Sequence, residues 1–411
     1  MNPTADVIVV GAGIIGSSIA YQLGRHGVSV ITLDKGVGPS EGSTGASSSI
    51  CRCRYTHPEV VRLAFHGQEA YGNWAEFTEV AQPRSELQRV GVLWMMGEST
   101  ERVDADVDKL ESQGVNAEML GPTDVNDRFP ALSSCAEPFD LTGETEHLCR
   151  LGEAFLFEPD GGYADPVGAN QDLIEATRRQ GGEVRFGSAV TGVIGDGGSV
   201  RGVKLSDGTR VFSDLVVNAA GPWCNRLNVL AGVSHRWTLT PTRVQTVYRP
   251  WPMELGPLPV VGDSSTGIYF RPESGGQQVL IGSVLPEDED EIVDDPDDFK
   301  RSPDVGFTQM KLAAFHHRIP ALAARGDFSG IAGLYTINRE DVHPIVGPTE
   351  VDGFWMANGF SGHGFKLAPA VGSMVAQAFS GRKSEFDTDV PIDFFSIDRD
   401  PIDVAVKGVL A

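Results

Sequence analysis

The chain has 411 residues, 41% of them hydrophobic, which is enough to bury a sizeable core in two or three domains or in one large interleaved domain. Its 56 acidic and 33 basic residues give a formal net charge of −23, which repels nucleic acid and anionic membrane surfaces and excludes both as expected partners. The sequence has no basic N-terminal region and no apolar stretch near the roughly 20 residues that span a bilayer, so we expect a cytoplasmic protein without a membrane span.

The N-terminal residues predict a βαβ unit with a nucleotide-binding turn. A strand, an apolar helix and a second strand follow one another within residues 5–34, and their apolar runs are typical of a buried parallel sheet. Gly11, Gly13 and Gly16 form a G-x-G-x-x-G motif, which permits a tight turn, a close approach of a pyrophosphate and close packing of helix on strand. Asp34 ends the second strand, where a carboxylate can accept hydrogen bonds from both ribose hydroxyls, although it can also be a surface turn residue.

The next segment, residues 47–57, alternates cysteine and arginine. Cys51 and Cys53 are too close along the chain for an unstrained disulfide, and the five cysteines of the sequence form no C-x-x-C pair. We therefore expect reduced, packed thiols and no metal site. The histidines that lack a cysteine or carboxylate partner at metal-ligand spacing are His57, His66, His316 and His317.

The middle of the chain alternates between helical and strand patterns. Residues 57–82 and 100–130 have the apolar spacing of helices, and residues 90–97 indicate a strand. A helix, a hairpin and a buried strand within residues 150–225 predict that this stretch rejoins the N-terminal sheet. Residues 235–300 alternate in the manner of an antiparallel sheet, which we expect to form a separate layer.

An acidic run at residues 286–299 precedes the C-terminal elements. It lacks the ordered spacing of a calcium loop, so we expect a solvated loop rather than a cation site. A helix is predicted over residues 307–322, and residues 331–380 contain a buried strand followed by a helix.

Two further segments favour FAD over NAD, although both cofactors use the N-terminal motif. DLVVNAAGPW at residues 214–223 is a buried strand that ends in glycine, as strands that pass close to a nucleotide do. NGFSGHGFKLAPAVG at residues 358–372 is a second glycine turn before a helix, without a second ribose acid, and suits another part of the same extended cofactor. Its helix N-terminus would stabilise negative charge on a reduced flavin. An NAD-type dehydrogenase with a structural C-terminal half is the alternative.

Seven segments, in order along nearly the whole chain, carry a family resemblance: VIVVGAGIIGSSIAYQL, VITLDKG, GSTGASSSICRCRY, LVVNAAGPW, GIYFRP, GLYTINREDVHPIVGP and GFSGHGFKLAPAVG. Together they resemble the D-amino-acid-oxidase-type flavoproteins, nearest the monomeric sarcosine oxidase and dimethylglycine dehydrogenase branch. The resemblance implies an α/β fold, α+β overall, with a Rossmann-like FAD-binding domain and a second, substrate domain built on an antiparallel β-sheet. We expect the FAD-binding domain at residues 1–85, 150–230 and 331–411, and the substrate domain at residues 86–149 and 231–330.

The glycine turns and the resemblance predict which residues hold FAD. They are Gly11, Gly13, Ile14, Ile15, Gly16, Asp34, Lys35, Ser43, Thr44, Ser47, Ser48, Val190, Ala220, Gly221, Trp223, Gly333, Tyr335, Gly359, Ser361, Gly362, His363, Gly364, Phe365 and Lys366. In the sarcosine oxidases that this chain resembles, a cysteine attaches FAD covalently. Gly333 stands at the corresponding place, so we expect FAD to be bound without a covalent bond.

Four residues are candidates for the chemistry. The resemblance implies that Arg52 and Lys366 hold a substrate carboxylate, as a planar fork and a point charge, and that Tyr269 lines the substrate pocket. His363 lies in the turn expected to face the flavin, where it polarises the ring or the amine, or simply bonds the backbone. A surface salt bridge is the ordinary alternative for Arg52. The lysine that activates oxygen in sarcosine oxidases would fall near Leu280, in a strand without lysine, which puts direct oxidase activity in doubt.

The predicted reaction is oxidation of the C–N bond of a small amino acid or N-methyl amino acid, such as sarcosine, dimethylglycine or an imino acid. Hydride passes from the carbon beside an uncharged amine to flavin N5, and the resulting imine is hydrolysed. Oxygen or another acceptor takes the electrons, and the chain is a monomer or a subunit of a complex. Two alternatives stay open: a flavin-binding subunit of a larger amine dehydrogenase or oxidase complex, and a D-amino acid or glycine oxidase.

Overall fold

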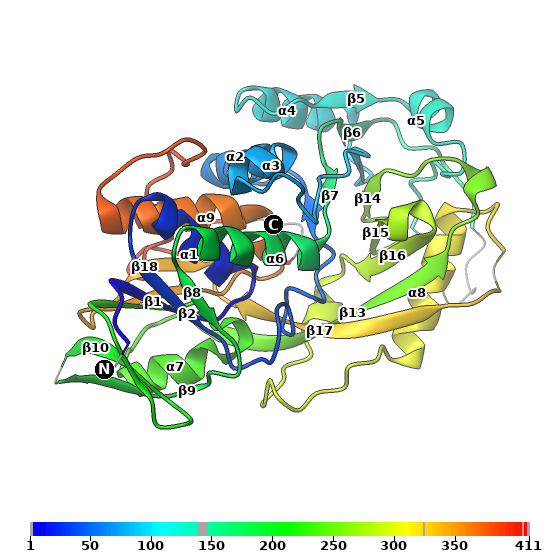
Figure 1. Cartoon of the computed structure of the whole chain (residues 1–411). Coiled ribbons are helices and arrows are strands. Elements are labelled where there is room, and N and C mark those ends of the chain that lie inside the picture. Colours follow the sequence, from blue (N-terminus) through cyan, green and yellow to red (C-terminus); the bar gives the residue numbers. More distant parts are fainter. Residues whose placement is uncertain (1–2, 139–146, 197, 324, 405–406, 409–411) are drawn as a thin grey trace.

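The N-terminal motif lies at the centre of a six-stranded sheet in the computed structural model, which describes residues 3–138, 147–196, 198–323, 325–404 and 407–408 (Figure 1). The sheet has the order β18-β19-β12-β1-β2-β8 and consists of β1 (Val7–Val10), β2 (Val30–Leu33), β8 (Glu183–Arg185), β12 (Leu215–Asn218), β18 (Ile345–Pro348) and β19 (Phe354–Asn358). Strand β1 is fully buried and pairs in parallel with β2 and β12, whereas β18 at one edge is antiparallel to β19. The predicted βαβ unit is confirmed, and β8 and β12 bring residues 150–225 back to it as expected.

Two small sheets flank the main one. The hairpin predicted within residues 150–225 leaves the six-stranded sheet and forms a three-stranded antiparallel sheet of β9 (Val190–Asp196), β10 (Ser199–Leu205) and β11 (Arg210–Phe212). The cysteine–arginine segment begins with β3 (Ile50–Cys51), which pairs with β7 (Gly162–Tyr163). Cys51 is therefore tied to a segment more than 100 residues away.

The second large sheet has eight strands in the order β17-β13-β16-β15-β14-β4-β6-β5. Its members are β4 (Val92–Met95), β5 (Glu118–Leu120), β6 (Phe155–Glu158), β13 (Leu239–Pro250), β14 (Val260–Asp263), β15 (Ile268–Glu273), β16 (Gln278–Ser283) and β17 (Ser329–Asn338). The sheet is antiparallel except where β4 and β14 pair in parallel. It forms the separate layer that the sequence predicts, and it also takes in β6 and β17 from stretches expected in the FAD-binding domain. The domain boundaries stay a prediction.

Helices cover the six-stranded sheet on the side seen above its strands in Figure 1, where α1, α2, α6 and α9 lie together. The helices are α1 (Ile14–Arg25), α2 (Pro58–Gly72), α3 (Trp74–Thr78), α4 (Thr100–Glu111), α5 (Pro122–Arg128), α6 (Pro166–Arg179), α7 (Cys224–Ala231), α8 (Val305–Arg318) and α9 (Gly364–Ser380). Short 3-10 turns occupy η1 (Gly221–Trp223), η2 (Met253–Leu255), η3 (Ser274–Gly276), η4 (Pro286–Glu289) and η5 (Ile392–Phe395). Within the described ranges, none of the helices combines the length and the apolar character needed to cross a membrane.

Helices α1 and α9 approach each other closely because small residues meet at their contact. The Ser18 hydroxyl donates a hydrogen bond to the Ala368 carbonyl at 2.7 Å, and a Cβ on Gly372 would lie 2.6 Å from the Ser18 hydroxyl oxygen. This contact brings the N-termini of both helices to the same side of the sheet, where the candidate site lies.

Two predicted helices differ from the observed ones. The helix expected over residues 57–82 breaks at Asn73, where the backbone leaves helical geometry between α2 and α3. The helical stretch expected over residues 100–130 contains a strand, because Gly114 adopts a positive φ of 83° after α4 and the next residues pair with β6. Apolar spacing alone does not reveal either interruption.

The acidic run at residues 286–299 is mostly exposed, as the sequence predicts, but several of its carboxylates have basic partners. Asp288 pairs with Lys311 at 2.7 Å, and Glu291 pairs with Arg243 at 2.6 Å. These partners come from α8 and β13, so residues distant in the sequence balance part of the charge of the run.

Candidate cofactor and substrate site

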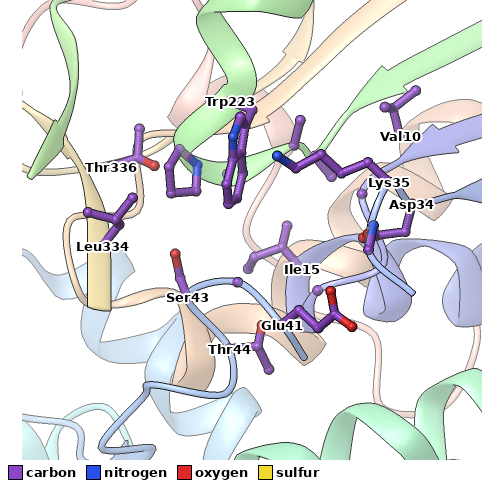
Figure 2. A pocket seen from close by; sticks show the side chains of 18 of the residues that line it. Val10, Ile15, Asp34, Lys35, Glu41, Ser43, Thr44, Trp223, Leu334 and Thr336 are labelled. Atoms are coloured by element: carbon purple, nitrogen blue, oxygen red, sulfur yellow. The ribbon is translucent and has the colours of Figure 1, made fainter. Parts of the chain in front are cut away.

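A cavity of about 710 Å³ opens at the carboxyl ends of β1, β2 and β12. Figure 2 shows Asp34 and Lys35 at one end of it and Leu334 and Thr336 at the other, with Trp223 between them. An elongated cavity at the ends of parallel strands, beside a helix N-terminus, is the usual place for a dinucleotide in such a sheet.

The glycines of the N-terminal motif are required by the local backbone. Gly11 has a φ of +107°, and a Cβ on it would lie 2.3 Å from the carbonyl oxygen of Ala219. A Cβ on Gly16 would lie 1.9 Å from the carbonyl oxygen of Gly11, so this residue lets α1 pack against the turn. Gly11 and Gly13 present bare backbone to the cavity, whereas Gly16 supports the turn from behind. This division matches the roles predicted for the three glycines.

The first turn of α1 is arranged around the cavity by two side chains. The Ile14 amide donates to the Thr44 hydroxyl oxygen at 2.9 Å, and the Ala12 amide donates to a carboxylate oxygen of Asp34 at 2.7 Å. The other carboxylate oxygen of Asp34 accepts from the Gly36 amide at 2.7 Å. These bonds fix the Asp34 carboxylate at the cavity wall, where its remaining lone pairs can accept ribose hydroxyls.

The second glycine turn forms the opposite end of the cavity. Gly359 and Gly362 have positive φ values of 78° and 85°, and Ser361 between them adopts 47°. The Ser361 hydroxyl accepts a hydrogen bond from the Asn338 amide at 3.0 Å, which helps to hold this left-handed serine. Helix α9 begins at Gly364, so its N-terminus faces the cavity from the side opposite to Asp34.

Most of the residues predicted to hold FAD line this cavity. Those that do are Gly11, Gly13, Ile14, Ile15, Asp34, Lys35, Ser43, Thr44, Ser47, Val190, Ala220, Gly221, Trp223, Tyr335, Gly359, Ser361, Gly362, Gly364 and Phe365. The predicted residues outside its lining are Gly16, Ser48, Gly333, His363 and Lys366. Gly16 acts through helix packing, and the other four lie directly beside lining residues in the sequence. Their contact with FAD stays a prediction.

Sequence reasoning missed part of the wall. The additional lining residues include Glu41, Gly42, Arg226, Asp297, Arg301, Leu334 and Thr336. Proximity could have suggested several of them, since Gly42 precedes Ser43 and both Leu334 and Thr336 flank Tyr335 in the sequence.

Asp297, one of these additional lining residues, belongs to the acidic run at residues 286–299. It accepts hydrogen bonds from the indole nitrogen of Trp223 at 3.0 Å and from Arg226 at 2.7 Å, and it pairs with Lys35. Burial raises the pKa of Asp297, but the hydrogen bonds from Lys35 and Arg226 outweigh this effect and lower it to about 2. The Lys35 ammonium also lies 4.0 Å from the centre of the Trp223 ring. We call Lys35, Trp223, Arg226 and Asp297 the clasp.

Arg52 and Lys366 lie together in the interior. Arg52 is 4% exposed and Lys366 is 5% exposed. The Arg52 guanidinium lies 4.1 Å from the ring centre of Tyr55 and 5.2 Å from that of Trp94, and it donates to the Arg54 carbonyl. Burial and the charge of Arg52 lower the pKa of Lys366 to about 7. The surface salt bridge considered for Arg52 is therefore excluded.

A buried glutamate that sequence reasoning missed completes this cluster. Glu158 is 1% exposed and accepts hydrogen bonds from the Cys53 amide at 2.6 Å, the Arg54 amide at 3.2 Å and the Trp94 indole at 2.8 Å. Burial raises its pKa despite these bonds. Cys51 and Cys53 are fully buried beside it, and burial raises the pKa of the Cys51 thiol to about 12. We call Arg52, Lys366 and Glu158 the charged cluster.

His363 is part of the wall behind the second glycine turn. It is 1% exposed, and its Nδ1 lies 3.1 Å from the Tyr55 hydroxyl. Burial and the charges of Lys366 and Arg52 hold its pKa well below the usual value, so the ring is neutral. A neutral imidazole here positions the Tyr55 side chain, which in turn packs on Arg52.

Tyr269 is placed in a second, much smaller cavity of about 20 Å³. Gly333 and Tyr335 also line this small cavity. Tyr335 lines the large cavity as well, so Tyr335 belongs to the wall between the two cavities. A Cβ on Gly333 would lie 2.5 Å from the Cβ of Ala46, which leaves no room for a cysteine at this position. Covalent attachment of FAD through this position is excluded by the packing.

The donors and shape of the cavity fit FAD. The bare glycine backbone and the N-terminus of α1 suit a pyrophosphate, the fixed Asp34 carboxylate suits a ribose, and the α9 N-terminus suits the flavin ring. The cavity extends from Asp34, on the first βαβ unit, to Thr336, beside the second glycine turn, so one extended cofactor can reach both (Figure 2).

Comparison with known proteins agrees with this geometry. The family model described as "DAO: FAD dependent oxidoreductase" matches residues 6–378. FAD-dependent oxidoreductase domain-containing protein 1 of Bos taurus is 29% identical over 91% of this chain and 80% of its own. Monomeric sarcosine oxidase of Streptomyces avermitilis is 26% identical over 92% of this chain and 94% of its own.

A solved structure also shares the fold. L-proline dehydrogenase from P. horikoshii superposes with a TM-score of 0.80 over 97% of this chain and 98% of that one, at 23% identity. The α/β fold class predicted from the sequence is thereby confirmed.

Proposed function

The chain belongs to the DAO family of FAD-dependent oxidoreductases, and from this membership we propose that it oxidises the C–N bond of a small amino acid or N-methyl amino acid. FAD, bound without a covalent bond, supplies the acceptor for a hydride from the carbon beside the amine nitrogen. The residues of the chain then have to hold the substrate carboxylate, orient the carbon–hydrogen bond and exclude water.

The observation that carries the proposal is the buried pair of cations, Arg52 and Lys366. Burial and, after it, the charge of Arg52 lower the pKa of Lys366, and an anion between the two cations would offset both effects. A carboxylate suits the planar guanidinium and the point charge of the ammonium. We infer that the substrate supplies this carboxylate.

Glu158 offsets only part of this positive charge. It is a single acid beside two cations, and two backbone amides and an indole already donate hydrogen bonds to its carboxylate. Its raised pKa also shows that burial opposes its charge. The charged cluster therefore favours one further anion.

The position of the charged cluster supports hydride transfer to the cofactor from a substrate held by Arg52 and Lys366. Lys366 directly follows Phe365, which lines the large cavity at the α9 end, and Arg52 stands five residues after Ser47, which lines it too. A carboxylate held by Arg52 and Lys366 would therefore lie beside the flavin end of the cavity. His363, kept neutral by burial, leaves the amine nitrogen without a competing cation from its ring.

We further propose that an acceptor other than oxygen takes the electrons. Leu280, at the position of the oxygen-activating lysine in the sarcosine oxidases, is 1% exposed in the core of β16. Lys311 approaches the end of this strand, but its ammonium pairs with Asp288 at 2.7 Å and donates to the Ser283 hydroxyl at 2.9 Å. A lysine tied in this way is poorly placed to serve oxygen.

An anaerobic flavin-bleaching screen tests the proposal. The purified yellow protein is mixed without oxygen with sarcosine, dimethylglycine, a cyclic imino acid and D-amino acids, and the loss of flavin absorbance is followed. Each acid is paired with the amine that lacks its carboxylate as the matched control. We expect bleaching by at least one acid and at least 100-fold slower bleaching by its control, because the cations would lose their anion.

Equal rates for an acid and its matched amine would contradict the role of the charged cluster. Failure of every amine to bleach a fully loaded flavin would instead favour the flavin-binding subunit of a larger complex. Stoichiometric peroxide in air, at a rate equal to that with an artificial acceptor, would overturn the preference for a dehydrogenase.

A further inference from the structure

A cluster of cysteine and histidine side chains lies at the edge of the eight-stranded sheet, apart from both cavities. Cys135, His147 and His317 each place one possible ligand atom within 4.8 Å of the other two. The sequence predicts no metal site because its cysteines and histidines are far apart along the chain. In the folded chain, however, these three side chains lie close together.

The separations match those between ligands of one metal ion. The Cys135 sulfur lies 3.4 Å from Nε2 of His147, and the rings of His147 and His317 meet edge to face at a centroid distance of 4.4 Å. A tetrahedral zinc with a sulfur ligand at about 2.3 Å and a nitrogen ligand at about 2.0 Å holds these two atoms about 3.5 Å apart. The observed sulfur–nitrogen separation therefore needs almost no adjustment.

A fourth ligand is available from Cys149. The Ala136 amide donates to the Arg150 carbonyl at 2.8 Å, and Cys135 forms an antiparallel bridge with Leu151, so the segment carrying Cys149 runs directly beside Cys135. Cys149 is exposed, and its side chain hydrogen-bonds with that of Cys135.

The surroundings hold the cluster in place. His317 lies in the last turn of α8, and its neighbour Arg318 donates to the Cys135 carbonyl at 2.8 Å. Arg318 is itself fixed by a fully buried pair with Asp263 at 2.7 Å. Buried groups thus hold the cluster on the side of Cys135 and His317, whereas Cys149 lies on the exposed side.

We infer that Cys135, His147, Cys149 and His317 bind one zinc ion as a structural site. The ion replaces the proton of each thiol, so two protons are released and two thiolates balance the charge of the dication. Two sulfurs and two imidazole nitrogens fill a tetrahedral site and leave no open position, which is typical of a structural zinc. The ion would join the segment around residues 147–151 to α8.

The test measures metal in the complete FAD-loaded protein, produced without a polyhistidine tag in zinc-supplemented cells. We expect about one zinc per chain by elemental analysis and, after exchange with Co²⁺, absorption between about 600 and 750 nm with a thiolate charge-transfer band, as tetrahedral sulfur ligation predicts. Cys135→Ser and His317→Gln should lose at least 90% of the zinc. His316→Gln, on the same helix, and Cys224→Ser, a buried cysteine elsewhere, are the matched controls and should keep it.

The FAD spectrum of each variant reports whether it folds, and the cobalt spectrum of the unaltered protein needs no variant. Zinc at background level in protein with full FAD, together with no cobalt band, would overturn the inference. A Cys135–Cys149 disulfide, seen as a mass lower by about 2 Da and as two fewer titratable thiols, would also overturn it.

Discussion

The two halves of the site are built in opposite ways. The end of the cavity near Gly11 is made of backbone: glycines without side chains, first-turn amides and one carboxylate held by amides. The charged cluster is made of side chains whose charges are buried, with Arg52, Glu158 and Lys366 brought together from three distant segments. Backbone recognition is encoded over a few consecutive residues, whereas a buried charge depends on everything packed around it.

This difference affects stability as well. The glycines of the turn bury no charge, whereas two buried cations and one buried acid cost free energy until an anion arrives. Ligand binding should therefore stabilise the charged cluster more than the backbone end of the cavity. Substitutions in the two regions should have different effects.

The largest effect is expected at the backbone end. Gly11→Ala places a Cβ against the Ala219 carbonyl at 2.3 Å in a left-handed conformation, so the turn has to move. We expect at least a 100-fold loss of FAD affinity, measured as flavin absorbance per chain and by titration of the stripped protein. Gly306→Ala, with open space around its Cβ and an ordinary helical setting, is the matched control and should keep full flavin. A Gly11→Ala protein with normal flavin would mean that the turn is not the cofactor contact.

The charged cluster should lose substrate but keep cofactor. Arg52→Ala should raise KM for a carboxylate substrate about 10- to 100-fold while flavin content stays normal, because the planar ion pair is lost. Arg54→Ala removes a neighbouring arginine that pairs with Glu98 at 2.7 Å and Asp106 at 2.9 Å, and is the matched control. Steady-state kinetics should show KM close to normal for that control. Equal KM values for the two variants would contradict the clamp.

The pKa of Lys366 predicts how ligand binding depends on pH. Below about pH 7 the folded protein holds Lys366 charged, and above it the side chain is neutral, so acetate should bind up to about tenfold more weakly for each pH unit above 7. Quenching of flavin fluorescence by acetate measures this, and Lys366→Met should bind weakly at every pH.

Stability should follow the same titration in the opposite sense. The unfolded chain keeps Lys366 charged up to its ordinary pKa of 10.5, so between about pH 7 and 10.5 the unfolded state binds the extra proton and stability rises with pH.

Acetate binding that is flat from pH 6 to 9 would show that Lys366 does not titrate near the ligand.

The smallest effect is expected at the thiol beside the cluster. Cys51 is fully buried, and its raised pKa keeps it protonated, so Cys51→Ala should lower the free energy of unfolding by only about 1 kcal/mol. KM and flavin content should stay within about twofold of the unaltered protein. A larger change in either one, seen in kinetics or absorbance, would give the thiol a functional role.

The sequence predicts the backbone end well because its signals are local. The G-x-G-x-x-G motif, Asp34 and the turn before α9 each lie within a few residues of a predicted strand or helix. The βαβ unit, the second sheet and the return of β12 followed from the same local patterns. The helix break at Asn73 and the strand β5 did not follow from local patterns, because residues outside the predicted helices decide both.

The charged cluster and the zinc ligands were harder to predict. Glu158 ends an ordinary apolar strand, and only the approach of Cys53 and Trp94 shows why an acid is buried there. His317 has no partner near it in the sequence, and Cys135 reaches it through the packing of α8 on the sheet. Resemblance to a family located Arg52 and Lys366, but the acid beside them required the structure.

The clasp affects how FAD enters and leaves the protein. Lys35 and Asp297 are 42% and 46% exposed, and pairs of this kind contribute only about 0–1 kcal/mol, so we expect that the clasp can open without unfolding the protein. A chain that binds its cofactor without a covalent bond can then be loaded after synthesis and reloaded later. Because salt screens exposed pairs, the half-time of FAD release should shorten at high ionic strength, and Asp297→Asn should shorten it at low ionic strength too.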